Sequence, residues 1–142
     1  MLSRTAEYAL RAVVNLSRQS EDHLVRAADM ARETGIPANF LSKILNQLVR
    51  QGIVRSERGR YGGFALAAPA ADLTLARVVS AFVSIADVEG CILGRPECSE
   101  DNPCGAHHRW ADVKDQIVEF FESTTIADVR AGARRGSAPR SL

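Results

Sequence analysis

The chain has 142 residues, enough for one domain to bury a core without disulfides or a structural metal. Its hydrophobic content of 46% and charged content of 25% are ordinary for a soluble globular protein. The longest uncharged apolar stretch, residues 78–86, is too short to span a membrane, and four charged residues among the first eighteen exclude a secretory signal. We therefore expect a cytoplasmic protein with no membrane partner.

The net charge of +1 hides an asymmetry along the chain. Residues 1–68 carry ten lysines and arginines against six acidic residues, whereas residues 86–130 carry four against ten. A basic front half suits a polyanion such as DNA, and an acidic half does not. One face of the molecule is therefore expected to meet DNA, with the rest turned away from it.

The front half predicts three helices followed by a hairpin. Helices are expected over residues 3–18, 26–34 and 38–51, and strands over residues 53–56 and 64–67. Ser3 is a plausible N-cap of the first helix, and Gly35 and Pro37 form the tight turn between the second and third. The turn between the strands, residues 57–63, is rich in glycine and arginine. This order of elements is typical of a winged helix-turn-helix.

In a helix-turn-helix the second helix enters the major groove, and its first residues meet base edges. The wing that follows can reach a neighbouring groove or the DNA backbone. The candidate DNA-binding residues are Asn39, Phe40, Ser42, Lys43 and Gln47 on the helix and Arg58, Arg60 and Tyr61 on the wing. Similar three-helix units also occur in proteins that bind no DNA, but the basic wing and the charge asymmetry together favour DNA binding.

The second half predicts two helices separated by a cysteine-rich loop. Residues 73–86 form a helix capped by Thr74, residues 90–105 form the loop, and a longer helix covers about residues 106–122. Four apolar residues recur along the long helix at steps of three and four, as in a helix–helix seam. They are Trp110, Val113, Ile117 and Phe120.

The remaining residues complete the predicted architecture. Residues 125–129 are expected to start one short turn, and residues 131–142 have the composition of a disordered tail. The fold class that follows is mainly α with a small β-wing. A winged helix-turn-helix occupies residues 1–68, and dimerisation helices with the cysteine-rich loop occupy residues 69–130.

The three cysteines, Cys91, Cys98 and Cys104, fall within fourteen residues, and His107 and His108 follow them. An odd number of cysteines cannot pair fully within one chain, and cytoplasmic thiols stay reduced, so metal or redox chemistry is favoured. The gaps of six and five residues exceed those of structural zinc knuckles and suit a larger object such as an iron–sulfur cluster. Three thiolates leave a fourth position, which either histidine or a distant carboxylate could fill.

Four pieces of the sequence carry a resemblance to a known family. They are residues 2–11, residues 36–41, residues 58–66, and the three spaced cysteines followed by Trp110. Together they resemble the IscR/NsrR family of winged-helix iron–sulfur transcriptional regulators. The resemblance implies a homodimer whose long helices cross, with each winged helix reading half of a partly palindromic operator in double-stranded DNA.

The same resemblance implies an iron–sulfur cluster held by the three cysteines and one further ligand, with [2Fe–2S] favoured over [4Fe–4S]. In the cluster-assembly regulators of the family the fourth ligand is a histidine, and the matching residue is His107. In the nitric-oxide-sensing members it is an N-terminal carboxylate of the other subunit, and the matching residue is Glu7. This sequence offers both ligands.

The expected function is a DNA-binding regulator, in the first place a repressor, that senses redox state, nitric oxide or iron–sulfur status through its cluster. One alternative is a thiol redox regulator without a cluster, and another is a zinc-binding module that contacts protein. Metal content separates these functions. Enzymatic activity is not expected, because the sequence has no Ser/His/Asp set, phosphate-binding loop or paired-acid motif.

Overall fold

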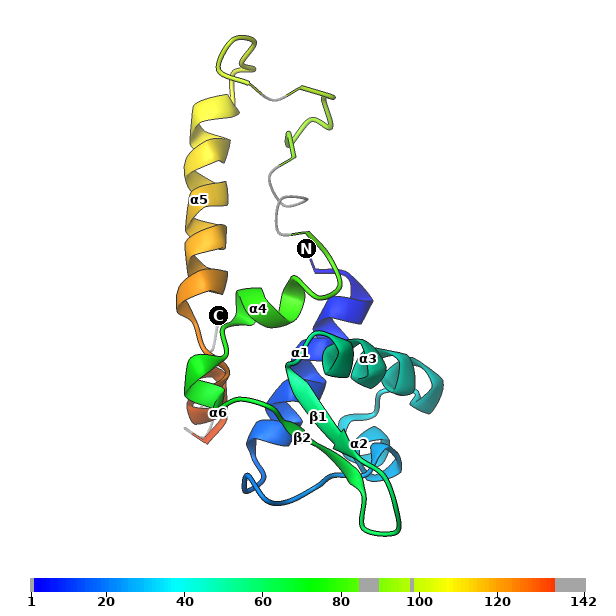
Figure 1. Ribbon diagram of the computed structural model, residues 1–142. Helices are drawn as coiled ribbons and strands as arrows, with labels where there is room; N and C mark the ends of the chain where they lie inside the picture. Colours follow the sequence, from blue (N-terminus) through cyan, green and yellow to red (C-terminus); the bar gives the residue numbers. More distant parts are fainter. Residues whose placement is uncertain (1, 85–89, 98, 135–142) are drawn as a thin grey trace, which may run out of the picture.

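The structure is a computed structural model that describes residues 2–84, 90–97 and 99–134, with the side chains of residues 132–134 excepted. Its elements are α1 (Arg4–Ser17), α2 (Ala27–Thr34), α3 (Ala38–Arg50), β1 (Val54–Glu57), β2 (Gly63–Leu66), η1 (Ala70–Asp72), α4 (Leu75–Val79), α5 (His107–Ser123) and α6 (Ile126–Arg134). In Figure 1, α5 rises away from a body formed by the other elements. The helix-rich architecture with one small hairpin confirms the predicted fold class.

Helix α1 lies at the centre of this body. Ala6, Ala9 and Ala12 have no exposed surface, and these small side chains let neighbouring helices approach closely. Helices α3, α4 and α6 all pack against α1. The hydroxyl of Ser3 accepts a hydrogen bond from the backbone N–H of Ala6 at 3.2 Å, which confirms Ser3 as the N-cap.

The helix-turn-helix is built from α2 and α3. Gly35 ends α2 in the left-handed conformation (φ 72°), where glycine meets no steric penalty. Pro37 is the N-cap residue and directly precedes α3, in the tight turn where we expected it. Helix α3 buries one face, made of Leu41, Ile44, Leu45 and Leu48, and leaves the opposite face exposed.

The predicted wing is an antiparallel hairpin in which Val54 pairs with Leu66 and Glu57 with Gly63. Close contacts require two of its glycines, Gly62 and Gly63. A Cβ atom at Gly62 would lie 2.2 Å from the carbonyl oxygen of Glu57. At Gly63 (φ 157°), a Cβ would lie 2.7 Å from the carbonyl oxygen of Val25, which pairs with Phe64 beside the hairpin. Any larger residue at these positions would have to displace backbone.

Helix α4 begins as predicted but is shorter. The hydroxyl of Thr74 caps it by accepting from the backbone N–H of Arg77 at 3.1 Å. The helix ends at Val79, whereas the prediction extended it to residue 86. The hydroxyl of Ser80, the C-cap residue, donates to the Ala76 carbonyl at 2.6 Å, a local bond that competes with continuation of the helix. The last two predicted positions lie outside the described residues.

Helix α6 is longer than the single turn that we predicted. Thr125 and Asp128 cap it reciprocally, because each backbone N–H donates to the other residue's side chain, at 2.9 and 3.2 Å. The backbone and side-chain hydrogen bonds from Thr125 lower the pKa of Asp128. The helix continues to Arg134, so the first four residues of the predicted disordered tail are helical, and residues 135–142 lie outside the described part of the chain.

One hydrophobic core joins the two halves of the chain. Val13 and Leu45 from the front half belong to the same buried cluster as Val78 and Ile126 from the second half. A side-chain bond adds to this connection, since the guanidinium of Arg130 donates to the Ser17 carbonyl at 2.7 Å. Among the described residues, no helix is long and apolar enough to cross a membrane.

Candidate DNA interface and candidate metal centre

The exposed face of α3 carries most of the predicted DNA contacts. Asn39, Phe40, Ser42 and Lys43 are all exposed at the start of this helix, as a recognition helix requires. The ring of Phe40 meets the ring of Tyr8 edge to face, with centroids 6.4 Å apart. The start of the recognition helix is therefore supported by α1.

Gln47 has a different environment from the other α3 candidates. It is half-buried, and its side-chain amide donates to the carbonyl of Ala81, just after α4, at 3.2 Å. Asn46, which we did not select from the sequence, is exposed and lies one turn beyond Ser42 and Lys43 on the same face. The burial of Leu45 and Leu48 on either side is the signal that could have separated the two positions.

The wing presents the three predicted residues at its tip. Arg58, Arg60 and Tyr61 are exposed, Tyr61 by 83%, and the guanidinium of Arg60 lies 5.8 Å from the centre of the Tyr61 ring. Arg26, at the start of α2, donates a hydrogen bond to the Arg60 carbonyl. This contact, which the sequence did not reveal, joins the wing to the helix-turn-helix.

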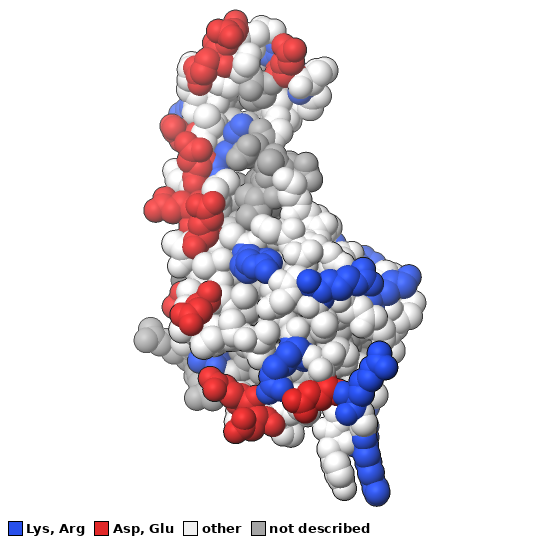
Figure 2. Space-filling view, in the orientation of Figure 1, with Lys and Arg blue, Asp and Glu red and all other residues white. Residues whose placement is uncertain are grey.

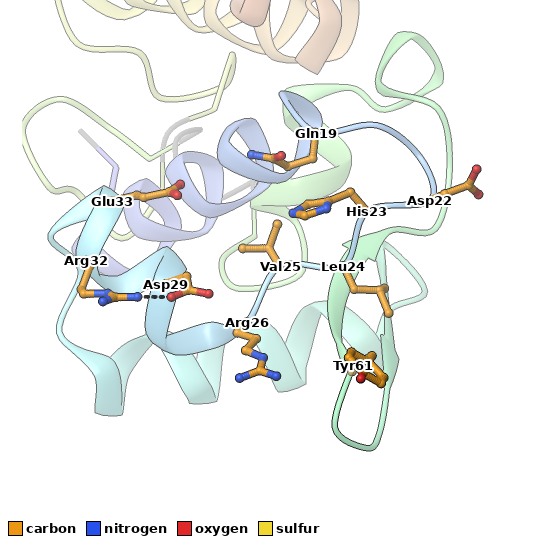
Figure 3. A pocket seen from close by; sticks show the side chains of 11 residues that line it. Gln19, Asp22, His23, Leu24, Val25, Arg26, Asp29, Arg32, Glu33 and Tyr61 are labelled. Atoms are coloured by element: carbon orange, nitrogen blue, oxygen red, sulfur yellow. Dashed lines mark hydrogen bonds and ion pairs between the residues drawn. The ribbon is translucent and has the colours of Figure 1, made fainter.

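A solvent-open hollow of about 700 Å³ lies between α2 and the wing (Figure 3). Arg26 at the start of α2 and Tyr61 on the wing border it, and His23 lines it from the connection before α2. Arg32 on the far side is ion-paired with Asp29. The hollow is an open groove between the two predicted DNA-binding elements, with arginines on its rim.

The charge asymmetry of the sequence becomes a spatial one (Figure 2). In this view basic side chains predominate over the middle of the body and the tip of the wing, with acidic side chains among them along its lower edge, and acidic side chains predominate along α5 and the loop above it. The acids on α5 are Asp112, Asp115, Glu119 and Glu122. A DNA duplex would be attracted to the first surface and repelled by the second.

The cysteine-rich loop is tied at both ends to the start of α5. The indole N–H of Trp110 donates to the Gly90 carbonyl at 2.8 Å, immediately before Cys91. At the other end, the backbone N–H of His107 donates to the Cys104 carbonyl at 3.0 Å. Cys91 and Cys104 are both half-buried thiols, whereas Cys98 lies outside the described residues.

His107 is the first residue of α5 and one of the few buried polar residues, with 6% of its surface exposed. Its Nε2 lies 3.2 Å from one carboxylate oxygen of Glu100, and Nδ1 of the exposed His108 lies 3.8 Å from the other. Glu100 was not selected from the sequence, because an acid in a polar loop carries no periodic signal. The N-terminal end of α5, where backbone N–H groups are directed outward, also favours thiolates and other anionic ligands.

Glu7 lies elsewhere in the same chain. It is an exposed residue in the first turn of α1 and borders a concavity of about 600 Å³ with Leu2 and the apolar residues Val113, Ile117 and Phe120. Glu7 therefore faces the middle of α5, six or more residues beyond His107, which is roughly 9 Å along the helix axis. Within one chain, the two candidate fourth ligands, Glu7 and His107, therefore lie at different positions along α5.

Residues 2–132 match the Rrf2 family, described as iron-dependent transcriptional regulators. The chain belongs to the Rrf2 family. It is 38% identical over 131 residues to an HTH-type transcriptional regulator of Aquifex aeolicus, covering 91% of this chain and 90% of that protein. It is 29% identical to the HTH-type transcriptional regulator IscR of Pectobacterium atrosepticum over 128 residues, covering 90% and 77%. As a member of this family the protein is a transcriptional regulator, and the expectation that it is not an enzyme is confirmed.

Solved structures show the same fold. CymR of B. subtilis, titled the global cysteine regulator, superposes with a TM-score of 0.79 at 21% identity, covering 93% of this chain and 97% of that one. IscR of T. potens gives a TM-score of 0.77 at 20% identity, covering 99% and 93%. The winged helix-turn-helix followed by a long helix is thus common to this chain, CymR and IscR.

Proposed function

We propose that this Rrf2 regulator binds operator DNA as a homodimer and senses its signal through an iron–sulfur cluster held by Cys91, Cys98, Cys104 and His107. The observation that carries the proposal is the position of the loop ends. Hydrogen bonds at Gly90 and Cys104 hold both described cysteines at the end of α5 where His107 begins the helix. Thiolates with one imidazole are a donor set suited to iron–sulfur clusters.

His107 is the better candidate for the fourth ligand within one chain. It is buried, three residues from Cys104, and bonded to that residue through its backbone. Glu7 borders the middle of α5 instead, so it could reach a cluster only in the partner subunit. Separate His107→Ala and Glu7→Ala variants distinguish the two ligands, because the spectrum of the bound cluster changes only when its own ligand is removed.

The contacts of α4 offer a route from the loop to the recognition helix. The loop begins soon after Ala81, whose carbonyl accepts from Gln47 on α3. The guanidinium of Arg77 on α4 donates to the Gln51 carbonyl at the end of α3. These two contacts connect α4 and the residues directly after it to the C-terminal half of α3, which supports α4 as the element that carries a signal to that helix. When bound, the cluster supplies a centre that is open to attack at its non-thiolate ligand.

The first experiment is iron and acid-labile sulfide analysis on protein purified without oxygen, together with operator binding. We expect iron, sulfide and visible charge-transfer bands, and tighter operator binding by the cluster-loaded protein than by the cluster-free protein. Equal affinities would contradict sensing through the cluster. Colourless protein that resists reconstitution would replace the proposal with thiol redox sensing, or with a zinc module if zinc is found.

Arg58→Ala should weaken operator binding by about tenfold and lower the dependence of log affinity on log salt by about one, as expected for loss of one phosphate contact. Arg58 is exposed on the wing and outside the core, so the fold and any cluster spectrum should not change. The matched control is Arg109→Ala, which removes an exposed arginine from the acidic helix α5. Equal affinities of the two variants in a salt titration would exclude the wing as a DNA contact.

A further inference from the structure

We propose that Glu100, His107 and His108 form a binding site for a borderline divalent cation such as Zn²⁺, distinct from the thiolate site. Each residue offers one ligand atom, and the three atoms lie within 4.8 Å of one another. The carboxylate joins the two rings, at 3.2 Å from Nε2 of His107 and 3.8 Å from Nδ1 of His108. The cluster site proposed above, with His107 as its fourth ligand, uses neither Glu100 nor His108.

The spacing of the ligand atoms fits tetrahedral zinc. Zinc–nitrogen and zinc–oxygen bonds of about 2.0–2.1 Å at the tetrahedral angle place ligand atoms roughly 3.4 Å apart. The distance of 3.2 Å between Nε2 of His107 and one carboxylate oxygen of Glu100 is close to this value, Nδ1 of His108 lies 3.8 Å from the other oxygen, and all three ligand atoms lie within 4.8 Å of one another. The side chains of Glu100 and His108 are 75% and 73% exposed, so both can move to bring the three atoms to this spacing.

The local fold explains how two consecutive histidines can share one ion. Consecutive helical residues do not face each other, but these two rings stand edge to face with centroids 5.3 Å apart and use different nitrogens. His107 is fixed by burial, and His108 and Glu100 are exposed and can adjust. Two imidazoles and one carboxylate are a donor set that zinc accepts, with a fourth position left for water.

The site shares His107 with the proposed cluster. If His107 is the fourth cluster ligand, zinc and cluster exclude each other at this end of α5; this consequence rests on the function proposed above. Binding of the cation itself does not depend on the proposed function, because the ligands of the cation include no thiolate. Zinc would then oppose cluster assembly in the cluster-free protein.

The test measures zinc binding to full-length protein in which all three cysteines are serine, by competition with a chromogenic chelator. We expect one zinc ion per chain in this variant, because its thiolates are gone and its histidines remain. Adding Glu100→Gln or His108→Asn should weaken binding by at least about tenfold, since one of three protein ligands is lost. Glu97→Gln, which removes a neighbouring exposed acid from the same loop, is the matched control and should change little.

Absence of zinc binding by the triple serine variant would overturn the proposal, as would equal weakening by Glu97→Gln and Glu100→Gln. A second measurement tests the sharing of His107. Prebound zinc should slow cluster reconstitution in the wild-type protein and have little effect in Glu100→Gln, which should still take up iron and sulfide. Slowing of equal extent in both proteins would show that zinc acts at the thiolates. The iron and sulfide content of the wild-type protein tests the proposed function, and this measurement is independent of the zinc-binding test.

Discussion

A Cys104→Ser variant is expected to purify without bound iron or acid-labile sulfide, although it should remain folded. Cys104 is half-buried in the loop and does not belong to the hydrophobic core, so the change from sulfur to oxygen removes a ligand and little packing. The carbonyl that accepts from His107 is a backbone group and is retained. We expect complete loss of the visible absorption bands and a melting temperature within about 4 °C of the cluster-free wild type, a difference of about 1 kcal/mol or less.

The control for Cys104→Ser is Ser99→Ala, because Ser99 lies in the same loop, is half-buried like Cys104, and has no place in the proposed ligand set. Ser99→Ala should retain iron, sulfide and operator binding at wild-type levels. A Cys104→Ser protein that kept its iron and sulfide would show that the three cysteines do not act together as ligands. A variant that failed to fold even in the apo form would show that the loop is part of the core.

The local signals in this sequence were sufficient for most of the fold. Ser3 and Thr74 are capping residues with a side-chain oxygen in the right position, and Gly35 takes the left-handed conformation that ends α2. The predicted lengths of α4 and α6 were wrong, since α4 is shorter and α6 is longer than the sequence pattern indicated. The apolar pattern beyond Val79 continues in the sequence, but the hydroxyl of Ser80 and the turn after it end the helix. The formation of α6 depends on burial of Ile126 in the core, which is a tertiary interaction that a local sequence pattern does not reveal.

The candidate sites were predictable in part for a related reason. Residues such as Cys104 and Arg58 can be selected as candidates from the sequence alone, because their type and spacing do not depend on the residues that pack around them. Gln47 and Asn46 are adjacent amides, and the buried leucines on either side are the one local signal that separates them, because the Ala81 carbonyl that accepts from Gln47 lies 34 residues away in the sequence. Glu100 contacts His107 because the loop folds back on α5. The two residues are seven positions apart in the sequence, and a loop has no regular period from which this contact could be predicted.

A Phe120→Asp variant is expected to be monomeric, because the substitution disrupts the proposed homodimer, and to lose operator binding with it. Phe120 is 54% exposed and Val113 43% exposed in the described chain, and both belong to the apolar series that predicted a helix–helix seam on α5. With Ile117 and Leu2 they line a concavity of about 600 Å³. Helix α5 projects from the body (Figure 1), and its exposed apolar side chains at helical spacing support the proposed dimer, in which a second copy of the helix would cover them.

A carboxylate at this position of the seam would be buried without a partner in the proposed dimer, which should raise the dimer dissociation constant at least about 100-fold, or about 2.7 kcal/mol. Phe120→Leu, the control at the same position, keeps an apolar side chain and should stay dimeric in analytical ultracentrifugation. Operator affinity should fall only in Phe120→Asp, because a dimer reads two half-sites and a monomer reads one. A monomeric Phe120→Asp protein that still bound the full operator with wild-type affinity would show that each winged helix acts alone, and a dimeric one would place the interface elsewhere.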